Sequence, residues 1–190
     1  TTCTDAATAT GFFHAEGTQI IDPEGNPYVA KGIVVSNWLT VEAYALGIDT
    51  VHDRHLNSDS DIENNLLRLL GSEEEREAFW QIYRDNYVTE ADIQNFKNWG
   101  FNSVRIPFNY RLLSPQDSPD VYLEEGFAWI DKLIGWCKNA GMSVLLDMHA
   151  CPGGQNHEPH SDPEYSYWYQ NEFGEYVERG VQVLLEQNDD

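Results

Sequence analysis

Basic residues are scarce in this sequence. Lysine and arginine together number 11 in 190 residues, against 32 aspartates and glutamates, and the formal net charge is −21. A chain this acidic repels the phosphates of nucleic acids and the headgroups of anionic membranes. We therefore expect neither nucleic acid nor membrane as a partner, and we interpret the acidity as a source of solubility.

Cysteines and long apolar runs are also few. Cys3, Cys137 and Cys151 cannot form a disulfide framework, although a single bridge stays open. Cys137 falls on the apolar side of a predicted helix and is expected to be a core residue. The sequence contains no apolar run of membrane-spanning length and no signal-peptide core. Because the chain starts at Thr1 rather than methionine, we expect that something upstream was removed or left out, and export stays open.

The residues that are present suit a folded α/β chain, since 41% are hydrophobic and 13% aromatic. We expect residues 1–11 to be a frayed or disordered terminus. Residues 12–35 predict a β-hairpin, turning at "DPEGNP", that runs into a strand. Between residues 57 and 99 we predict three helices, which start at Asp59 or Ser60, at Ser72, and at a Thr89–Asp92 capping box.

Two segments resemble each other internally. "NWGFNSVRIPF" (98–108) and "NAGMSVLLDMH" (139–149) both place Asn-x-Gly before an apolar residue and Ser-Val, with an amphipathic helix between them. This repetition predicts βα units with parallel strands at about 32–37, 102–108 and 143–149, and another helix near 170–187. Three such strands leave an edge unpaired, so the chain is either a small doubly wound domain or the first part of a barrel, which needs roughly 250 residues.

Polar side chains stand at the carboxyl ends of the second and third predicted strands. Arg105 points away from Val104 and Ile106, and His149 shares a strand face with Asp147. Ligands bind at this end of parallel sheets, so we expect Arg105 and His149 to converge there. The alternative is that Arg105 merely forms a structural ion pair with Asp147.

The segment after the third strand has several interpretations. Gly153 and Gly154 lack the Lys-Ser/Thr of a P-loop, and we expect them to let the backbone approach a ligand closely. Potential ligands there match no zinc spacing, and residues 57–63 lack the central glycine of a calcium loop. We therefore expect no metal and no cofactor. The potential zinc ligands in this segment are His149, Cys151, His157, His160 and Asp162.

Aromatic residues follow each predicted strand. Trp38 follows the first strand, Tyr110 the second, and residues 165–169 supply four more aromatics after the third. They are either core residues or platforms for sugar rings. In the second case the sugar hydroxyls would bind Gln155, Asn156 and Glu42.

Three stretches together resemble the opening third of glycoside hydrolase family five, the cellulase-like and exo-glucanase-like (β/α)₈ barrels. They are "KGIVVSNWLTVEAY" (31–44), "FWQIYRDNYVTEADIQNFKNWGFNSVRIPFNY" (79–110) and "DMHACPGGQN" (147–156). The resemblance implies an α/β fold: an N-terminal β-hairpin and about three βα units of a TIM (β/α)₈ barrel. Residues 12–190 would then be the N-terminal part of the catalytic domain, truncated after the third helix.

The resemblance also implies a function, that of a retaining, secreted β-glycosidase acting on a β-glucan-type polysaccharide or oligosaccharide. Arg105 matches the arginine that orients the nucleophilic carboxylate, His149 matches a histidine that contacts the sugar, and Glu42 matches an acidic residue that binds sugar hydroxyls. The family's two catalytic glutamates are absent, since the chain has no Asn-Glu-Pro segment and ends before a fourth strand. We therefore expect this segment alone to be inactive and to need the missing C-terminal half of the barrel.

Two other functions are alternatives to a glycosidase. A non-catalytic carbohydrate-binding module would keep only the sugar-contacting strands, and the sequence downstream of Asp190 would distinguish it from an enzyme. A small nucleotide-binding domain would need a phosphate loop after the first strand, and "SNWLTVE" is not one.

Overall fold

The computed structural model describes residues 12–48, 58–156 and 158–163. The chain divides into two compact units, residues 1–31 and 32–190, which are described separately. The predictions for residues 1–11 and for the helix near 170–187 lie outside the described residues, as do Cys3, His157 and the aromatic residues 165–169.

The first unit is a small antiparallel sheet of β1 (His14–Glu16), β2 (Gln19–Ile21) and β3 (Pro27–Tyr28), in the order β1-β2-β3. The predicted turn at "DPEGNP" joins β2 to β3, and Asp22 Oδ1 accepts the backbone N–H of Asn26 at 2.7 Å. A second turn, between β1 and β2, was not predicted. Gly17 occupies it at a φ of 60°, a conformation that side-chain-bearing residues seldom adopt.

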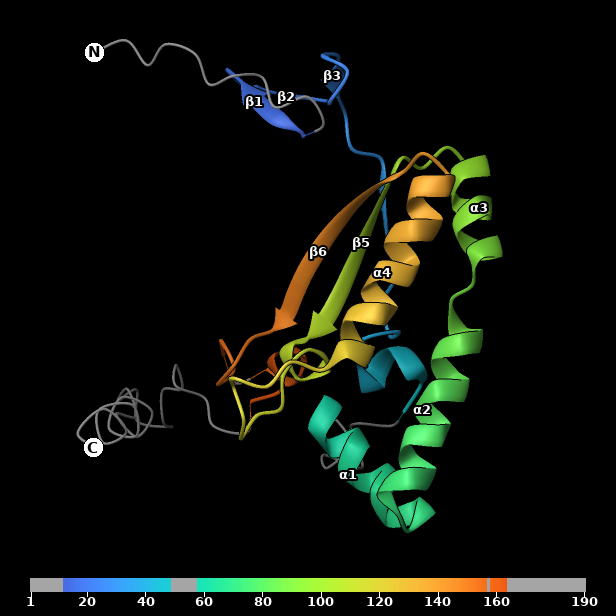
Figure 1. The fold of residues 1–190 in the computed structure, drawn as a ribbon, viewed down its shortest axis with the longest axis vertical. Helices are drawn as coiled ribbons and strands as arrows, with labels where there is room; N and C mark the ends of the chain where they lie inside the picture. The colour runs from blue at the N-terminus through green and yellow to red at the C-terminus, as the bar shows by residue number, and fades with distance from the viewer. Residues whose placement is uncertain (1–11, 49–57, 157, 164–190) are drawn as a thin grey trace, which may run out of the picture. The chain divides into compact units, whose positions relative to one another are not determined.

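The second unit contains a parallel sheet in the order β4-β5-β6 (Figure 1). Its strands are β4 (Gly32–Val34), β5 (Ser103–Asn109) and β6 (Ser143–Ala150), which confirms the three predicted strands. β4 is shorter than predicted. Asn37 takes a φ of 59° and turns the chain, although Leu39 still bridges to Phe108 in parallel.

The described residues of this unit form four α-helices: α1 (Asp59–Leu70), α2 (Glu73–Tyr87), α3 (Glu90–Asn98) and α4 (Glu124–Asn139). Ser72 caps α2, and Thr89 and Asp92 form the predicted capping box of α3. The predicted cap of α1 at Asp59 or Ser60 is wrong. Ser58 Oγ accepts the N–H of Asp61, which releases the Asp59 side chain for a buried role described below.

Helix α4 lies alongside β5 and β6 and covers one face of the sheet (Figure 1). Its residues Ile130, Leu133 and Cys137 pack with Val104 and Ile106 of β5 in one core cluster. Cys137 is fully buried and carries a free thiol, as predicted for a core residue, and burial raises its pKa to about 11. Sequence periodicity therefore identified the apolar faces that join this helix to the sheet.

The outer strand β6 leaves large apolar side chains uncovered among the described residues. Leu145 is 54% exposed and Leu146 51% exposed, although they point to opposite faces of the strand. Val34 on the opposite edge strand is 44% exposed. A parallel sheet is normally covered on both faces, whereas these positions of the two outer strands are left uncovered by the described residues.

In the part of the chain that the structure describes, three short 3₁₀ helices follow the strands near their carboxyl ends. They are η1 (Ala43–Leu46), η2 (Tyr110–Leu112) and η3 (Pro159–Ser161). Each lies in a strand-to-helix connection or in the segment after β6, close to the polar side chains that β5 and β6 carry.

Candidate active site at the carboxyl end of the sheet

The side chains of Arg105, Asp147 and His149 meet at the carboxyl half of β5 and β6. Arg105 Nη2 donates to Asp147 Oδ2 at 2.5 Å, and His149 Nδ1 lies 3.0 Å from the same oxygen. Arg105 Nη2 and His149 Nδ1 are 3.2 Å apart. The predicted convergence and the alternative ion pair are therefore both present in one cluster.

Strand register explains why these groups meet. Arg105 pairs with Leu145 and Pro107 with Asp147 across the parallel ladder, so Arg105 and Asp147 lie on the same face of the sheet. The opposite face of β5 carries the fully buried Val104 and Ile106. The Arg105 and Asp147 side chains are 37% and 24% exposed, respectively, so the cluster is open enough to receive a ligand.

Gln155 holds the backbone next to this cluster. Its Nε2 donates to the carbonyl oxygen of His149 at 2.6 Å, and its Oε1 accepts the N–H of Cys151 at 3.2 Å. Gly154 is buried, and a Cβ there would lie 3.0 Å from Pro163. The close approach that the glycine pair predicted is thus made at Gly154 by the chain itself, and Gln155 is committed to the loop.

Asn156 also bonds within this segment. Its Oδ1 accepts the Glu158 N–H at 2.8 Å and the Ser161 hydroxyl at 2.5 Å, while Nδ2 lies 3.5 Å from His160 Nε2. These bonds place His160 beside His149, with ring centroids 5.4 Å apart. The sequence singled out His160 only as a rejected zinc ligand, and nothing in its spacing signalled this pairing.

Glu42 lies at the start of η1, and its side chain accepts the Tyr44 hydroxyl at 3.3 Å. The negative charge of Glu42 raises the pKa of Tyr44, whose ring is 70% exposed. The backbone N–H of Glu42 donates to the buried Asn37 side chain at 2.7 Å, which fixes the turn after β4. The Glu42 carboxylate is thus partly exposed and able to meet a ligand.

Trp38 differs from the expectation of a sugar platform. It is 1% exposed, its indole packs edge-on against Trp129 and is stacked with Trp136, and its Nε1 donates to the carbonyl of Arg84 at 2.9 Å. With its ring faces covered by α4 residues, this indole is part of the core and has no open face for a sugar. Tyr110, the other predicted platform, begins η2 directly after β5 and is partly exposed.

A buried polar network not predicted from sequence joins the three strand-end connections. Asn109 Nδ2 donates to Asp59 at 2.9 Å and to Asp162 at 2.7 Å. Asp59 also accepts the Thr40 hydroxyl at 2.7 Å and the Val41 N–H at 2.5 Å. Burial raises the pKa of the Asp59 carboxyl, and these hydrogen bonds oppose the rise.

Asp162 closes the network from the segment after β6. It accepts the N–H of Ser60 at 2.9 Å and forms an ion pair with Arg111 of η2. The available sequence signal was Asn109, a polar residue at the end of a buried strand. Its partners come from segments about fifty residues away on either side, which local sequence patterns do not reveal.

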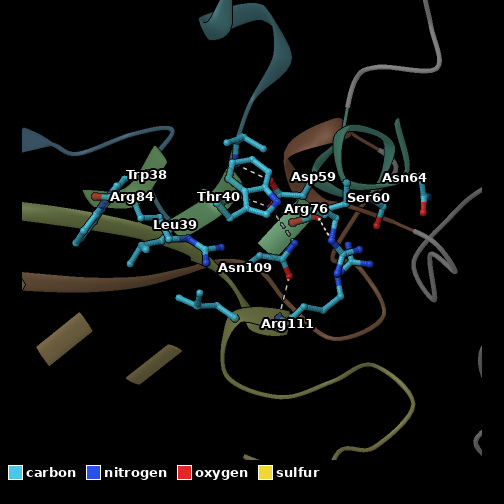
Figure 2. Close-up of a pocket in the computed structure, with 14 residues that line it drawn as sticks. Trp38, Leu39, Thr40, Asp59, Ser60, Asn64, Arg76, Arg84, Asn109 and Arg111 are labelled. Carbon is cyan, nitrogen blue, oxygen red and sulfur yellow. Dashed lines mark hydrogen bonds and ion pairs between the residues drawn. The ribbon is translucent and has the colours of Figure 1, made fainter. Parts of the chain in front are cut away.

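A cavity of about 340 Å³ adjoins this network (Figure 2). Asp59 and Asn109 line it together with Arg76, Arg84 and Arg111. Burial lowers the pKa of Arg84, and the nearby carboxylates of Glu125, Glu63 and Asp59 oppose that effect. Neither Arg105 nor His149 lines the cavity, so it is separate from the cluster on β5 and β6.

Within 12–48, 58–156 and 158–163, no three His, Cys, Asp or Glu side chains are grouped so that they could hold a metal ion. None of the helices in those same ranges has the length and apolar character needed to cross a membrane.

Comparison with known proteins identifies relatives. The Cellulase family, glycosyl hydrolase family 5, matches residues 63–187. A β-xylosidase of Phanerodontia chrysosporium is 32% identical over 80% of this chain and 30% of its own length. A glucan 1,3-β-glucosidase of Lachancea kluyveri is 35% identical over 66% of this chain and 29% of its length. An endoglucanase C of Acetivibrio thermocellus is 36% identical over 40% of this chain and 22% of its length.

Solved structures confirm the predicted fold. The rutinosidase of Aspergillus niger superposes with a TM-score of 0.58 at 21% identity, over 76% of this chain and 40% of that structure. The chain thus has the fold of part of a TIM (β/α)₈ barrel, as predicted. It spans less than a third of the length of the three sequence relatives named above.

Proposed function

Because the chain belongs to glycosyl hydrolase family 5, we propose that the protein carrying it is a retaining β-glycosidase of β-glucan-type polysaccharides or oligosaccharides. The observation that carries this proposal is the Arg105–Asp147–His149 cluster. It stands at the carboxyl end of parallel strands, the end where TIM-barrel enzymes hold their substrates. The family and the names of these relatives support the proposed glycoside hydrolase activity.

Each site residue has a proposed role. Arg105 holds the nucleophilic carboxylate ionised and oriented, and His149 contacts the sugar next to the cleaved bond. Glu42, partly exposed at the start of η1, accepts hydrogen bonds from sugar hydroxyls. Tyr110 offers a partly exposed ring beside the same edge, whereas Gln155 and Asn156 act by shaping the loop that holds His149 and His160.

The two catalytic carboxylates belong, on this proposal, to the part of the barrel beyond residue 190. Retaining glycosidases need an acid/base and a nucleophile with carboxyl groups about 5–5.5 Å apart. This placement is supported by the coverage, because the chain matches only 30% of the length of the β-xylosidase relative. It is also supported by the exposed apolar side chains of Leu145, Leu146 and Val34 on the outer strands. We take residues 12–190 as the N-terminal part of that catalytic domain, and we expect residues 1–190 alone to be inactive.

The proposal also covers the substrate and the cellular location of the enzyme. The named relatives comprise a β-xylosidase, a glucan 1,3-β-glucosidase and an endoglucanase. Two of these names specify a β linkage and two specify a glucan, which supports a β-glucan-type substrate. Polysaccharides of this kind are too large to enter a cell intact. A secreted or cell-envelope enzyme would meet them, and we propose that location.

The test compares the full-length protein with residues 1–190 on cellulose, laminarin and nitrophenyl β-glycosides. We expect the full-length protein to hydrolyse these substrates and residues 1–190 not to. Proton NMR of the first product should show the β-anomer, which is the signature of retention. An inverted product would contradict the mechanism. Saccharide binding without turnover by the full-length protein would instead favour a non-catalytic carbohydrate-binding module.

A further inference from the structure

We propose that Asp147 is a positioning residue that fixes the proton of His149 on Nδ1 and so makes Nε2 a hydrogen-bond acceptor for a sugar hydroxyl. This inference rests on the proposed glycosidase function for the identity of the ligand. The state of the imidazole, however, follows from geometry alone and can be measured without any substrate.

The first step is the sharing of one carboxylate oxygen. Asp147 Oδ2 lies 2.5 Å from Arg105 Nη2 and 3.0 Å from His149 Nδ1. An arginine is always protonated and can only donate, so Arg105 is the donor and Asp147 the acceptor in their hydrogen bond. The imidazole nitrogen can donate or accept, and its surroundings decide which.

The second step compares the two positions of the proton. With the proton on Nε2, the Nδ1 lone pair would face the Asp147 oxygen at 3.0 Å, and two acceptors would repel each other. With the proton on Nδ1, the ring forms a charge-assisted bond to that oxygen. Arg105 Nη2 lies farther from Nδ1, at 3.2 Å, and already donates to Asp147. The Nδ1–H form is therefore favoured.

The third step concerns the other ring nitrogen. Among the described residues, the hydrogen bonds of the His149 ring are made at Nδ1, to Asp147 and Arg105, and the side chain is 26% exposed. Gln155 also holds the His149 carbonyl at 2.6 Å, so the ring is fixed from the backbone and from Nδ1. A fixed, unprotonated Nε2 can accept a hydrogen bond from a sugar hydroxyl and cannot donate one.

The Asp147 carboxylate also orients the guanidinium group of Arg105. Both contacts of Arg105 within the described part of the chain pass through Nη2. This arrangement leaves Nη1 and Nε for a second acceptor, the role that the proposed function gives to the nucleophilic carboxylate. Removing the Asp147 charge should therefore disturb His149 and Arg105 together.

The direct test is nitrogen-15 NMR of the full-length protein with labelled histidine, recorded at alkaline pH where imidazoles are neutral. We expect His149, assigned by its loss in His149→Gln, to show a protonated Nδ1 and a pyridine-type Nε2. In Asp147→Asn the amide can turn its N–H toward Nδ1, and we expect the proton to move to Nε2. A protonated Nε2 in the unsubstituted protein would overturn the proposal.

Activity provides the second readout. An aspartate-to-asparagine change beside a catalytic histidine can select the wrong tautomer without changing the fold. We expect Asp147→Asn to lower kcat/KM at least tenfold and Asp147→Glu to restore part of it. Asp131→Asn, on the exposed face of α4, serves as the matched control and should leave kcat/KM unchanged. Unchanged kcat/KM in Asp147→Asn would count against the positioning role.

The two proposals fail separately. If the full-length protein hydrolyses no β-glycoside, the glycosidase function fails, while the NMR spectrum still decides the state of His149. If hydrolysis is seen but Nε2 carries the proton, the function stands and the role of Asp147 falls.

Discussion

Gln155 donates its side-chain amide to the carbonyl oxygen of His149 at 2.6 Å, across six residues of the loop that follows β6. The same side chain accepts the Cys151 N–H at 3.2 Å. A glutamine thus closes the turn that presents the imidazole, and it does so with both ends of its amide. The geometry of the candidate site therefore depends on a residue that the sequence suggested as a sugar ligand.

Replacing this amide by a carboxylate should damage the turn. In Gln155→Glu an acceptor faces the His149 carbonyl where a donor stood, and an unpaired polar group costs about 1–3 kcal/mol. We expect chemical denaturation of the full-length protein to show a loss of that size, with a fall in kcat/KM. Gln94→Glu, exposed on α3, is the matched control. Equal stability of the two variants would contradict the role of Gln155.

Gly126 marks a tight contact between α4 and η2. A Cβ at Gly126 would clash with the Leu112 carbonyl oxygen, whereas a Cβ at Gly135 on the same helix would meet nothing within 4 Å. We expect Gly126→Ala to destabilise the protein by about 3 kcal/mol because the backbone of η2 must move. Gly135→Ala should be stabilising by about 0.5–1 kcal/mol, since alanine favours helix.

Thermal unfolding of both variants checks this contrast. The two substitutions add the same methyl group to the same helix, so any general effect of alanine cancels between them. A Gly126→Ala protein as stable as Gly135→Ala would show that η2 does not pack against α4 as described.

Burial of Asp59 predicts a pH dependence of stability. Its pKa is raised above the ordinary value of 3.8 in the folded protein, so the unfolded chain loses this proton first as the pH rises. The protonated Asp59 carboxyl therefore contributes fully to the free energy of unfolding below pH 3.8, the ordinary pKa. This contribution declines as the pH rises through the higher pKa of the folded state. We expect the difference in unfolding free energy between wild-type protein and Asp59→Asn to shrink over this interval.

Urea denaturation at a series of pH values measures that difference. The hydrogen bonds lost in Asp59→Asn, to Thr40, Val41 and Asn109, add an offset, and only the slope with pH tests the prediction. A difference that grows with pH would show that Asp59 ionises readily in the folded state.

Sequence patterns predicted the regular part of the fold well. Apolar runs located β5 and β6, and the spacing of Ile130, Leu133 and Cys137 identified the buried face of α4. These features are local, because hydrophobic period and capping residues are encoded in neighbouring positions. The start of α1 was less certain because Ser58, Asp59 and Ser60 are all good caps, and the buried Thr40 and Val41 recruit Asp59.

Long-range contacts explain what sequence patterns missed. Trp38 follows a strand, as a sugar platform would, but its ring faces are covered by Trp129 and Trp136 from a helix ninety residues later. Asp162 reaches Asn109 only after the chain has turned back across the sheet. The pair of Arg105 and His149 was predictable because parallel strands align their carboxyl ends, whatever the connections between them.

The central claim is that Arg105 serves the nucleophile of a glycosidase. Its most direct test is kcat/KM of Arg105→Lys in the full-length protein on a nitrophenyl β-glycoside, with the exposed Arg68→Lys of α1 as control. Lysine keeps the charge but not the planar set of donors, so we expect a loss on the order of 100-fold in Arg105→Lys and none in Arg68→Lys. Full activity in Arg105→Lys would contradict the account.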